Sequence, residues 1–328
     1  MKYRVVALFL GLFAVGFLSA QTTLTDVINE FNAGVEFLNN QEYDGALGHF
    51  NQTIALADQV GEEAAEMKTK AEDQIPATYY RQATVFMKRK QYDNAIPFLE
   101  KTVEFASLYN NNEEFKDKSL KYLPSLYVLE GNKALKNGGK ENALVYFDKA
   151  LQLNPDLYHA HQGKGLVYKD QEDTENMLAA FAQAKEGARA KGDNETIAEI
   201  NGVIDAYFNK FILEEMELVD PEDNDYTYVI EACDKALAAN NQNPRAYYHL
   251  ALIKNKMIEY DAAIENALKA LEFETDPVWI SALYYELGHA YQNTVEYDKA
   301  CESLKKVSEE PFKSRAEKKM GSIPGCIM

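Results

Sequence analysis

Apolar side chains recur along this chain at the spacing of an amphipathic helix. In the clearest stretch, Asn194–Leu218, six apolar residues follow a period near 3.6 residues. These residues are Ile197, Ile200, Ile204, Tyr207, Phe208 and Phe211. We therefore expect one long helix over this range, and a short charged helix over Phe312–Met320.

A second pattern of small and aromatic residues repeats over a longer distance. A set of four positions returns after 34 residues. The first set is Gly131, Ala143, Phe147 and Ala150, and the second is Gly165, Met177, Phe181 and Ala184. A Tyr-Asp-x-Ala motif also occurs four times, starting at Tyr43, Tyr92, Tyr260 and Tyr297. In each copy the alanine follows another small residue by 12 positions, as the two closely crossing helices of a hairpin require.

These hairpins resemble the tetratricopeptide repeat family. One repeat carries Gly131, Ala143, Phe147, Ala150 and Pro155 at the family's positions, and the last carries Gly288, Tyr291, Tyr297, Ala300 and Leu304. The resemblance implies an all-α fold, a right-handed α-solenoid of stacked helix-turn-helix hairpins. We expect seven hairpins, anchored at Ala46, Ala95, Ala143, Met177, Ala232, Ala263 and Ala300.

The chain departs from a uniform repeat in two places. Helix-forming residues Glu62–Gln74 and Glu113–Tyr122 precede Pro76 and Pro124. We expect each to add a helical piece that kinks or restarts at the proline, whose ring removes a backbone donor.

Five segments make up the expected organisation of the chain. They are a signal at 1–20, an N-terminal array with extended helices at 21–219, an acidic loop and candidate hinge at 220–225, C-terminal repeats at 226–310, and a capping helix with a frayed tail at 311–328.

The first twenty residues have the features of a cleaved export signal. Lys2 and Arg4 precede the apolar run Val5–Phe17, and small residues follow up to Ala20. We expect cleavage after Ala20 and a location in the periplasm of a Gram-negative bacterium, with secretion or outer-membrane association as alternatives. The apolar run is shorter than the roughly 20 residues that cross a bilayer, and no later segment is apolar enough, so we expect no membrane span after cleavage.

Composition narrows the classes of partner. The 328 residues are 46% hydrophobic, which allows a packed interior, and the formal net charge is -18. Loss of Lys2 and Arg4 with the signal would take this charge two units lower. Such a surface repels nucleic acid and anionic lipids, so we expect protein partners instead.

Three cysteines are too few and too scattered for a disulfide framework. Cys233 and Cys301 stand beside small helical positions, where we expect buried thiols. Cys326 lies in the predicted frayed tail, and we expect it to be exposed. The sequence leaves the redox state of all three open.

No strong catalytic or metal-binding motif is present, so we expect no enzyme, no cofactor and no metal. His159 and His161 are two residues apart, and on a helix they point in different directions. The Gly163-Lys164 pair lacks the remainder of a phosphate-binding loop. Residues 220–225 lack the alternating ligands and the glycine of a calcium loop.

The remaining candidate site is the concave surface that the family resemblance implies. Side chains of the first helix of each repeat would line it and hold a peptide or a partner helix. The candidate partner-binding residues are Tyr80, Lys88, Asn132, Lys136, His159, Gln162, Lys169, Arg245, Tyr248, Lys256, Tyr285 and His289. Three of these lysines share one repeat position, and a helix dipole alone also favours lysine there.

We therefore expect an exported, non-enzymatic scaffold that binds proteins or peptides of the cell envelope. Two alternatives remain at this level: a self-assembling structural protein that forms homo-oligomers, and a helical metal-binding or enzymatic module. The sequence identifies neither the partner, nor the physiological pathway, nor the oligomeric state.

Overall fold

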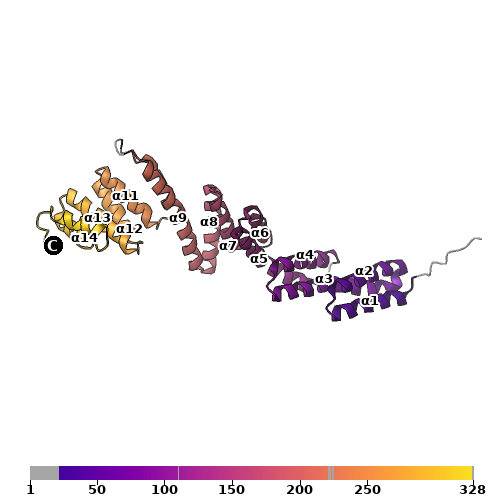
Figure 1. Cartoon of the computed structure of the whole chain (residues 1–328). Helices are drawn as coiled ribbons and strands as arrows, with labels where there is room; N and C mark the ends of the chain where they lie inside the picture. Colours follow the sequence, from indigo (N-terminus) through magenta and orange to yellow (C-terminus); the bar gives the residue numbers. More distant parts are fainter. Residues whose placement is uncertain (1–21, 110, 221–222, 224, 327–328) are drawn as a thin grey trace, which may run out of the picture. The chain divides into compact units, whose positions relative to one another are not determined.

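The structure, a computed structural model, describes residues 22–109, 111–220, 223 and 225–326. The proposed signal Met1–Ala20 lies outside these residues. Within them the chain forms α-helices, a short 3-10 helix η1 (Glu62–Ala64) and no β-strand (Figure 1). The helices are α1 (Leu24–Asn39), α2 (Tyr43–Val60), α3 (Ala65–Lys88), α4 (Tyr92–Leu108), α5 (Glu113–Lys136), α6 (Lys140–Leu153), α7 (Tyr158–Asp170), α8 (Thr174–Lys191), α9 (Asn194–Leu218), α10 (Thr227–Ala239), α11 (Pro244–Lys256), α12 (Tyr260–Leu271), α13 (Pro277–Asn293), α14 (Tyr297–Lys305) and α15 (Phe312–Met320).

Helical hairpins of consecutive helices build the chain, and the all-α solenoid fold expected from the repeats is confirmed. All seven expected anchor residues are buried, with at most 1% of their surface exposed. Small residues opposite them let the helices cross closely: a Cβ atom added at Gly165 would lie 2.5 Å from the ring of Phe181, and one at Gly288 would lie 2.5 Å from Leu304.

The chain divides into two compact units. The first comprises residues up to 137 together with 148–155, and the second comprises 138–147 together with 156–328. In the first unit, Phe50 of α2 and Ile75 of α3 belong to a core that also includes Leu38 of α1. The second unit has a large core formed by α8, α9, α10 and α11, which fixes the position of the site described below.

The turn inside most hairpins contains a residue in the left-handed conformation, two positions before the second helix. These residues are Gln41, Lys90, Gly138, Glu172, Ile258 and Val295, with φ between 57 and 81°. Glycine adopts this conformation without strain, whereas a β-branched residue does not. The turn geometry is therefore kept even where the residue is unsuited to it.

The extra helical segments before Pro76 and Pro124 are confirmed. Of the two outcomes expected at each proline, the restart is wrong and the kink stays a prediction. Both α3 and α5 continue through their proline as single helices. In α3, Ile75 before the proline and Ala83 after it are both fully buried. We attribute the continuity to this packing, which outweighs the backbone hydrogen bond that the proline removes.

The long helix predicted over Asn194–Leu218 is confirmed as α9. The Asp193 side chain caps its start by accepting a hydrogen bond from the Thr196 backbone N–H. Near the other end of the helix, Ile212 is buried, whereas Phe211 is 39% exposed. The loop after α9 includes residues 221, 222 and 224, which lie outside the described residues.

The helices before and after this loop, α9 and α10, contribute to one buried cluster within the second unit. The boundaries between the two compact units therefore lie before residues 220–225 in the sequence. A hinge at this loop stays a prediction.

The C-terminal segment corrects two expectations. The capping helix α15 spans Phe312–Met320 as predicted, but Cys301 and Cys326 form a disulfide, with Cα atoms 5.6 Å apart. Ile323 is 4% exposed, so the tail packs rather than frays as far as it is described. These contacts form because α15 folds back onto α13 and α14. The two cysteines are 25 residues apart in the sequence, so the sequence alone does not indicate that they lie close together.

The third cysteine agrees with expectation. Cys233 is a free thiol with no exposed surface, and burial raises its pKa to about 12. Among the described helices, none has both the length and the apolar character needed to cross a membrane.

Candidate functional site

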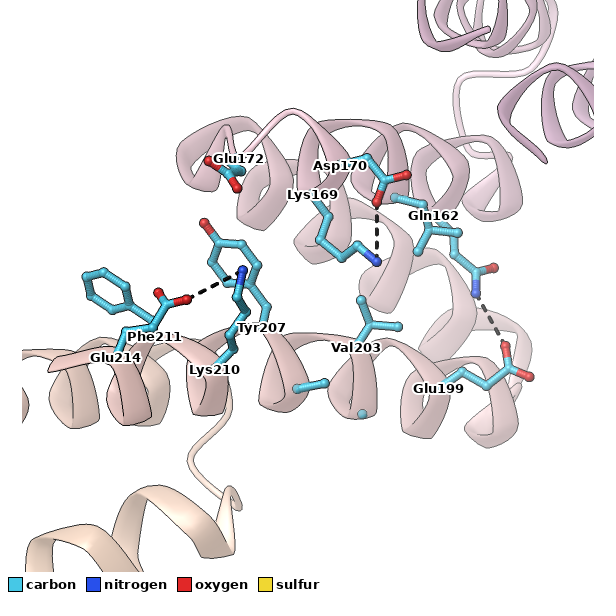
Figure 2. A pocket seen from close by; sticks show the side chains of 13 residues that line it. Gln162, Lys169, Asp170, Glu172, Glu199, Val203, Tyr207, Lys210, Phe211 and Glu214 are labelled. Atoms are coloured by element: carbon cyan, nitrogen blue, oxygen red, sulfur yellow. Dashed lines mark hydrogen bonds and ion pairs between the residues drawn. The ribbon is translucent and has the colours of Figure 1, made fainter. Parts of the chain in front are cut away.

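A groove with a volume of about 1060 Å³ opens between α7 and α9 in the second unit. In Figure 2, labelled side chains of the two helices face each other across this space. The lining residues are Gln162, Leu166, Lys169, Asp170, Glu172, Glu199, Gly202, Val203, Ala206, Tyr207, Lys210, Phe211 and Glu214.

One wall is a continuous face of α9. Its lining residues follow a helical spacing of three and four from Glu199 to Glu214, which corresponds to about 22 Å along the axis. A different face of the same helix, with Ile200, Ile204 and Phe208, is buried in the core. The helix is thus fixed on its core side and presents a second face to the groove.

The other wall is α7, which is positioned through its glycines. A Cβ atom added at Gly163 would lie 2.3 Å from the ring of Phe147 on α6, so only glycine allows α7 to pack on α6 at this distance. This packing leaves Gln162, Leu166 and Lys169 facing the groove.

Polar contacts join the two sides of the groove. The Gln162 Nε2 atom donates a hydrogen bond to Glu199 Oε2 at 3.3 Å, from one wall to the other. Near the start of α8, the hydroxyls of Thr174 and Tyr207 are 2.6 Å apart. These two contacts tie α9 to the preceding hairpin.

The charges at the groove are mostly neutralised in pairs, with an acidic excess. Lys169 pairs with Asp170 at 3.4 Å, and Lys210 pairs with Glu214 at 3.5 Å. The carboxylates of Glu172 and Glu199 have no ion pair with any described residue of the chain. The groove therefore combines an apolar middle with a net negative rim.

The groove lining supplies apolar and charged side chains that could contact a bound molecule. Over the described ranges, no three or more His, Cys, Asp or Glu side chains gather where they could hold a metal ion. The groove contains no histidine, serine or cysteine that could act as a nucleophile or as an imidazole base.

The structure places two predicted partner-binding residues, Gln162 and Lys169, in this groove. His159 is exposed in the first turn of α7 and contacts Tyr158 with its ring tilted, the ring centroids being 4.1 Å apart. Four further predicted residues are exposed near the ends of other helices. They are Lys88, Asn132, Lys136 and Lys256.

The predicted aromatic residues instead contact helices of the same chain. Tyr80 packs on Phe115, with ring centroids 5.0 Å apart. Tyr248 is 8% exposed and packs edge-on against Trp279, with centroids 4.9 Å apart. The Arg245 guanidinium lies 3.7 Å from the centroid of the same tryptophan ring.

The last hairpin is covered by the C-terminal helix. Tyr285 of α13 contacts Phe312, with ring centroids 6.0 Å apart, and His289 Nδ1 lies 2.8 Å from Lys319 Nζ. Burial, together with the nearby Lys319 ammonium, lowers the pKa of His289, so its neutral ring can accept this hydrogen bond. These groups already have partners within the chain.

Sequence reasoning missed the α9 wall of the groove. It included Tyr207 and Phe211 in the apolar pattern of the long helix without predicting that they line a binding surface. A second stripe through Gly202, Ala206 and Lys210 is visible in the sequence and marks the face that the core does not cover.

Comparison with known proteins finds a family model that matches three parts of the chain. The family model described as "Tetratricopeptide repeat" matches residues 76–107, 244–277 and 281–310. A TPR repeat-containing protein of the archaeon Methanocaldococcus jannaschii is 20% identical over 172 residues, which are 52% of this chain and 25% of that protein. The chain therefore spans about a quarter of the length of this curated relative. These matches support the tetratricopeptide repeat family and do not bear on bacterial export.

Three solved structures are also similar to this chain. The complex of the TPR2AB domain of yeast Sti1 with pHSP90 is 18% identical, covers 91% of this chain and 94% of its own, and gives a TM-score of 0.34. The TPR domain of P58(IPK) is 15% identical over 90% of this chain and 99% of its own, with a TM-score of 0.32. The MamA protein is 24% identical over 63% of this chain and 98% of its own, with a TM-score of 0.31.

Proposed function

We propose that this chain is a non-enzymatic scaffold that binds a segment of a partner protein in the groove between α7 and α9. The observation that carries the proposal is the open groove between α7 and α9, about 1060 Å³ in volume and lined by apolar and charged side chains. Repeat arrays of this kind use extended surfaces for protein binding, which is consistent with a scaffold. Tyr207 and Phe211 supply large apolar contact area at small entropic cost.

We further propose that the scaffold is exported and acts on proteins of the cell envelope. The pattern of Met1–Ala20 supports export. The disulfide between Cys301 and Cys326 supports an oxidising compartment, because such bonds persist in the periplasm and are rare in the cytosol.

Affinity capture with site-specific variants tests this function. A photo-crosslinking residue at position 211 should capture a partner from the envelope fraction, and capture should fall in the Tyr207→Ala variant, which removes part of the apolar contact area of the groove. Tyr228→Ala is the matched control, since Tyr228 is an aromatic residue on α10, 67% exposed and outside the groove.

Capture that is equal in both variants would place binding elsewhere on the molecule and reject the groove. Crosslinks only between copies of the chain, with light scattering that rises with concentration, would replace the scaffold with a self-assembling protein.

A further inference from the structure

An exposed glycine lies in the α9 wall, near its Glu199 end. Gly202 is exposed within a 25-residue helix, where glycine is destabilising by about 1 kcal/mol relative to alanine. At Gly163, Gly165 and Gly288 an added Cβ atom would clash with a neighbouring side chain, whereas at Gly202 it would meet nothing within 4 Å. Packing within the chain therefore does not account for this glycine.

The residue one turn later is also small. Ala206 follows Gly202 by four positions, so the two share one face and form a shallow notch in the groove wall. Val203, Tyr207 and Phe211 line the same wall, and Leu166 lines the opposite one. Small residues at such a point allow the backbone of another helix to approach closely, while larger apolar residues beside them enclose its side chains.

The lining residues also distinguish a helical occupant from an extended one. An extended peptide has backbone N–H and C=O groups that need partners, and the backbones of both walls are bonded within their own helices. Gln162 is the one amide among the groove-lining side chains, and it already bonds Glu199. A helix brings its backbone hydrogen bonds with it, and the 22 Å wall would accommodate about four of its turns.

The charge of the rim indicates which residues of a bound helix would flank its apolar face. The lining residues include four carboxylates and two lysines, and both lysines are paired with carboxylates. Glu172 and Glu199 remain for cations supplied by a partner. Lysine or arginine on either side of the stripe would meet them.

We propose that the groove binds an amphipathic α-helix of a partner protein, with its apolar stripe seated on Gly202 and Ala206 and basic residues against Glu172 and Glu199. This inference rests on the proposed function and specifies the class of partner.

A randomised peptide library provides the test. Peptides of about 18 residues, long enough for the groove wall, are displayed and selected against the whole chain. Binders are then measured against the Gly202→Leu and Gly48→Leu variants. Gly48 is a matched control, since it is an exposed glycine within α2 that also has open space around an added Cβ atom.

We expect selected peptides to be basic and to become helical on binding, as measured by circular dichroism. Their affinity should fall about tenfold or more with Gly202→Leu, because the new side chain fills the notch, and should be unchanged with Gly48→Leu. Groove-dependent binders that are acidic, or that carry proline within the bound segment, would overturn the helix inference and leave the groove function in place. A selection in which no binder is sensitive to Gly202→Leu would reject the groove function itself.

Discussion

His249 is a buried histidine whose protonation opposes folding. It lies on α11, is 5% exposed, and its Nδ1 atom has no hydrogen-bond partner among the described residues. Burial, with a smaller contribution from the Arg245 charge, lowers its pKa from 6.5 to about 4. Between these two values the unfolded chain binds a proton that the folded chain does not, so stability falls as the pH falls below about 6.5.

We predict that the wild type loses about 1 to 2 kcal/mol more stability than a His249→Gln variant on going from about pH 7.5 to about pH 5. The single tryptophan, Trp279, lies 6.4 Å from His249 between ring centroids, so its fluorescence during urea unfolding reports on this region. Burial raises the pKa of Glu286, so its protonation favours folding as the pH falls, which is opposite to the effect of His249. Both proteins contain Glu286, so its effect cancels in the difference between their pH profiles. Parallel pH profiles for the two proteins would show that His249 is not held neutral.

In one hairpin turn, the residue type is unsuited to the backbone conformation that the turn requires. Ile258 in the turn between α11 and α12 has φ 65° and is 72% exposed. The left-handed conformation costs a β-branched residue on the order of 1 to 3 kcal/mol, whereas asparagine tolerates it. We predict that Ile258→Asn raises the stability of the C-terminal repeats by about 1 kcal/mol in urea unfolding.

The neighbouring residue supplies the control for this turn. Met257 is 41% exposed with φ -81°, so Met257→Asn also removes an exposed apolar side chain but relieves no strain. Equal effects of the two substitutions would attribute the change to lost surface hydrophobicity instead of the turn.

A disulfide links the segment after the C-terminal helix to the last hairpin. The bond between Cys301 and Cys326 closes a loop of 25 residues that contains α15, for which chain entropy gives about 3.5 kcal/mol as an upper value. We predict that Cys326→Ser speeds amide hydrogen exchange in α15, and that a reducing agent does the same to the wild type. Since the variant has no bond left to break, the reductant should not change its exchange further. Unchanged protection in the variant would mean that the packing of Ala316, Met320 and Ile323 alone holds the segment.

The elements differ in how far the sequence could predict them. The hairpins and α9 follow from local periodicity, which is why Asn194–Leu218 was placed with its observed bounds. The disulfide and the covering of Tyr285 by Phe312 depend on how α15 folds back, and no periodic signal encodes that contact. Of the residues that line the groove, only Gln162 and Lys169 of α7 are among those predicted from the sequence, because the position of α9 depends on its packing with later helices.

At the scale of the whole molecule, charge is the dominant property. The chain has 52 acidic and 34 basic residues, a formal net charge of -18. A field of this sign attracts cationic segments from solution and repels anionic ones, and salt screens it over about 10 Å at 0.1 M. The acidic rim of the groove thus lies within a field of the same sign, and both favour the approach of a basic helix.

We predict that a lysine-rich helical peptide selected on the groove associates about tenfold or more slowly when NaCl is raised from about 0.05 to about 0.5 M. Its dissociation rate should change much less, because the apolar contacts around Gly202 and Phe211 hold the bound helix. Stopped-flow fluorescence measures both rates, and a peptide with glutamine in place of each lysine is the control, whose association should depend little on salt. An association rate for the lysine peptide that is insensitive to salt would show that the acidic surface serves solubility alone and does not guide the partner to the groove.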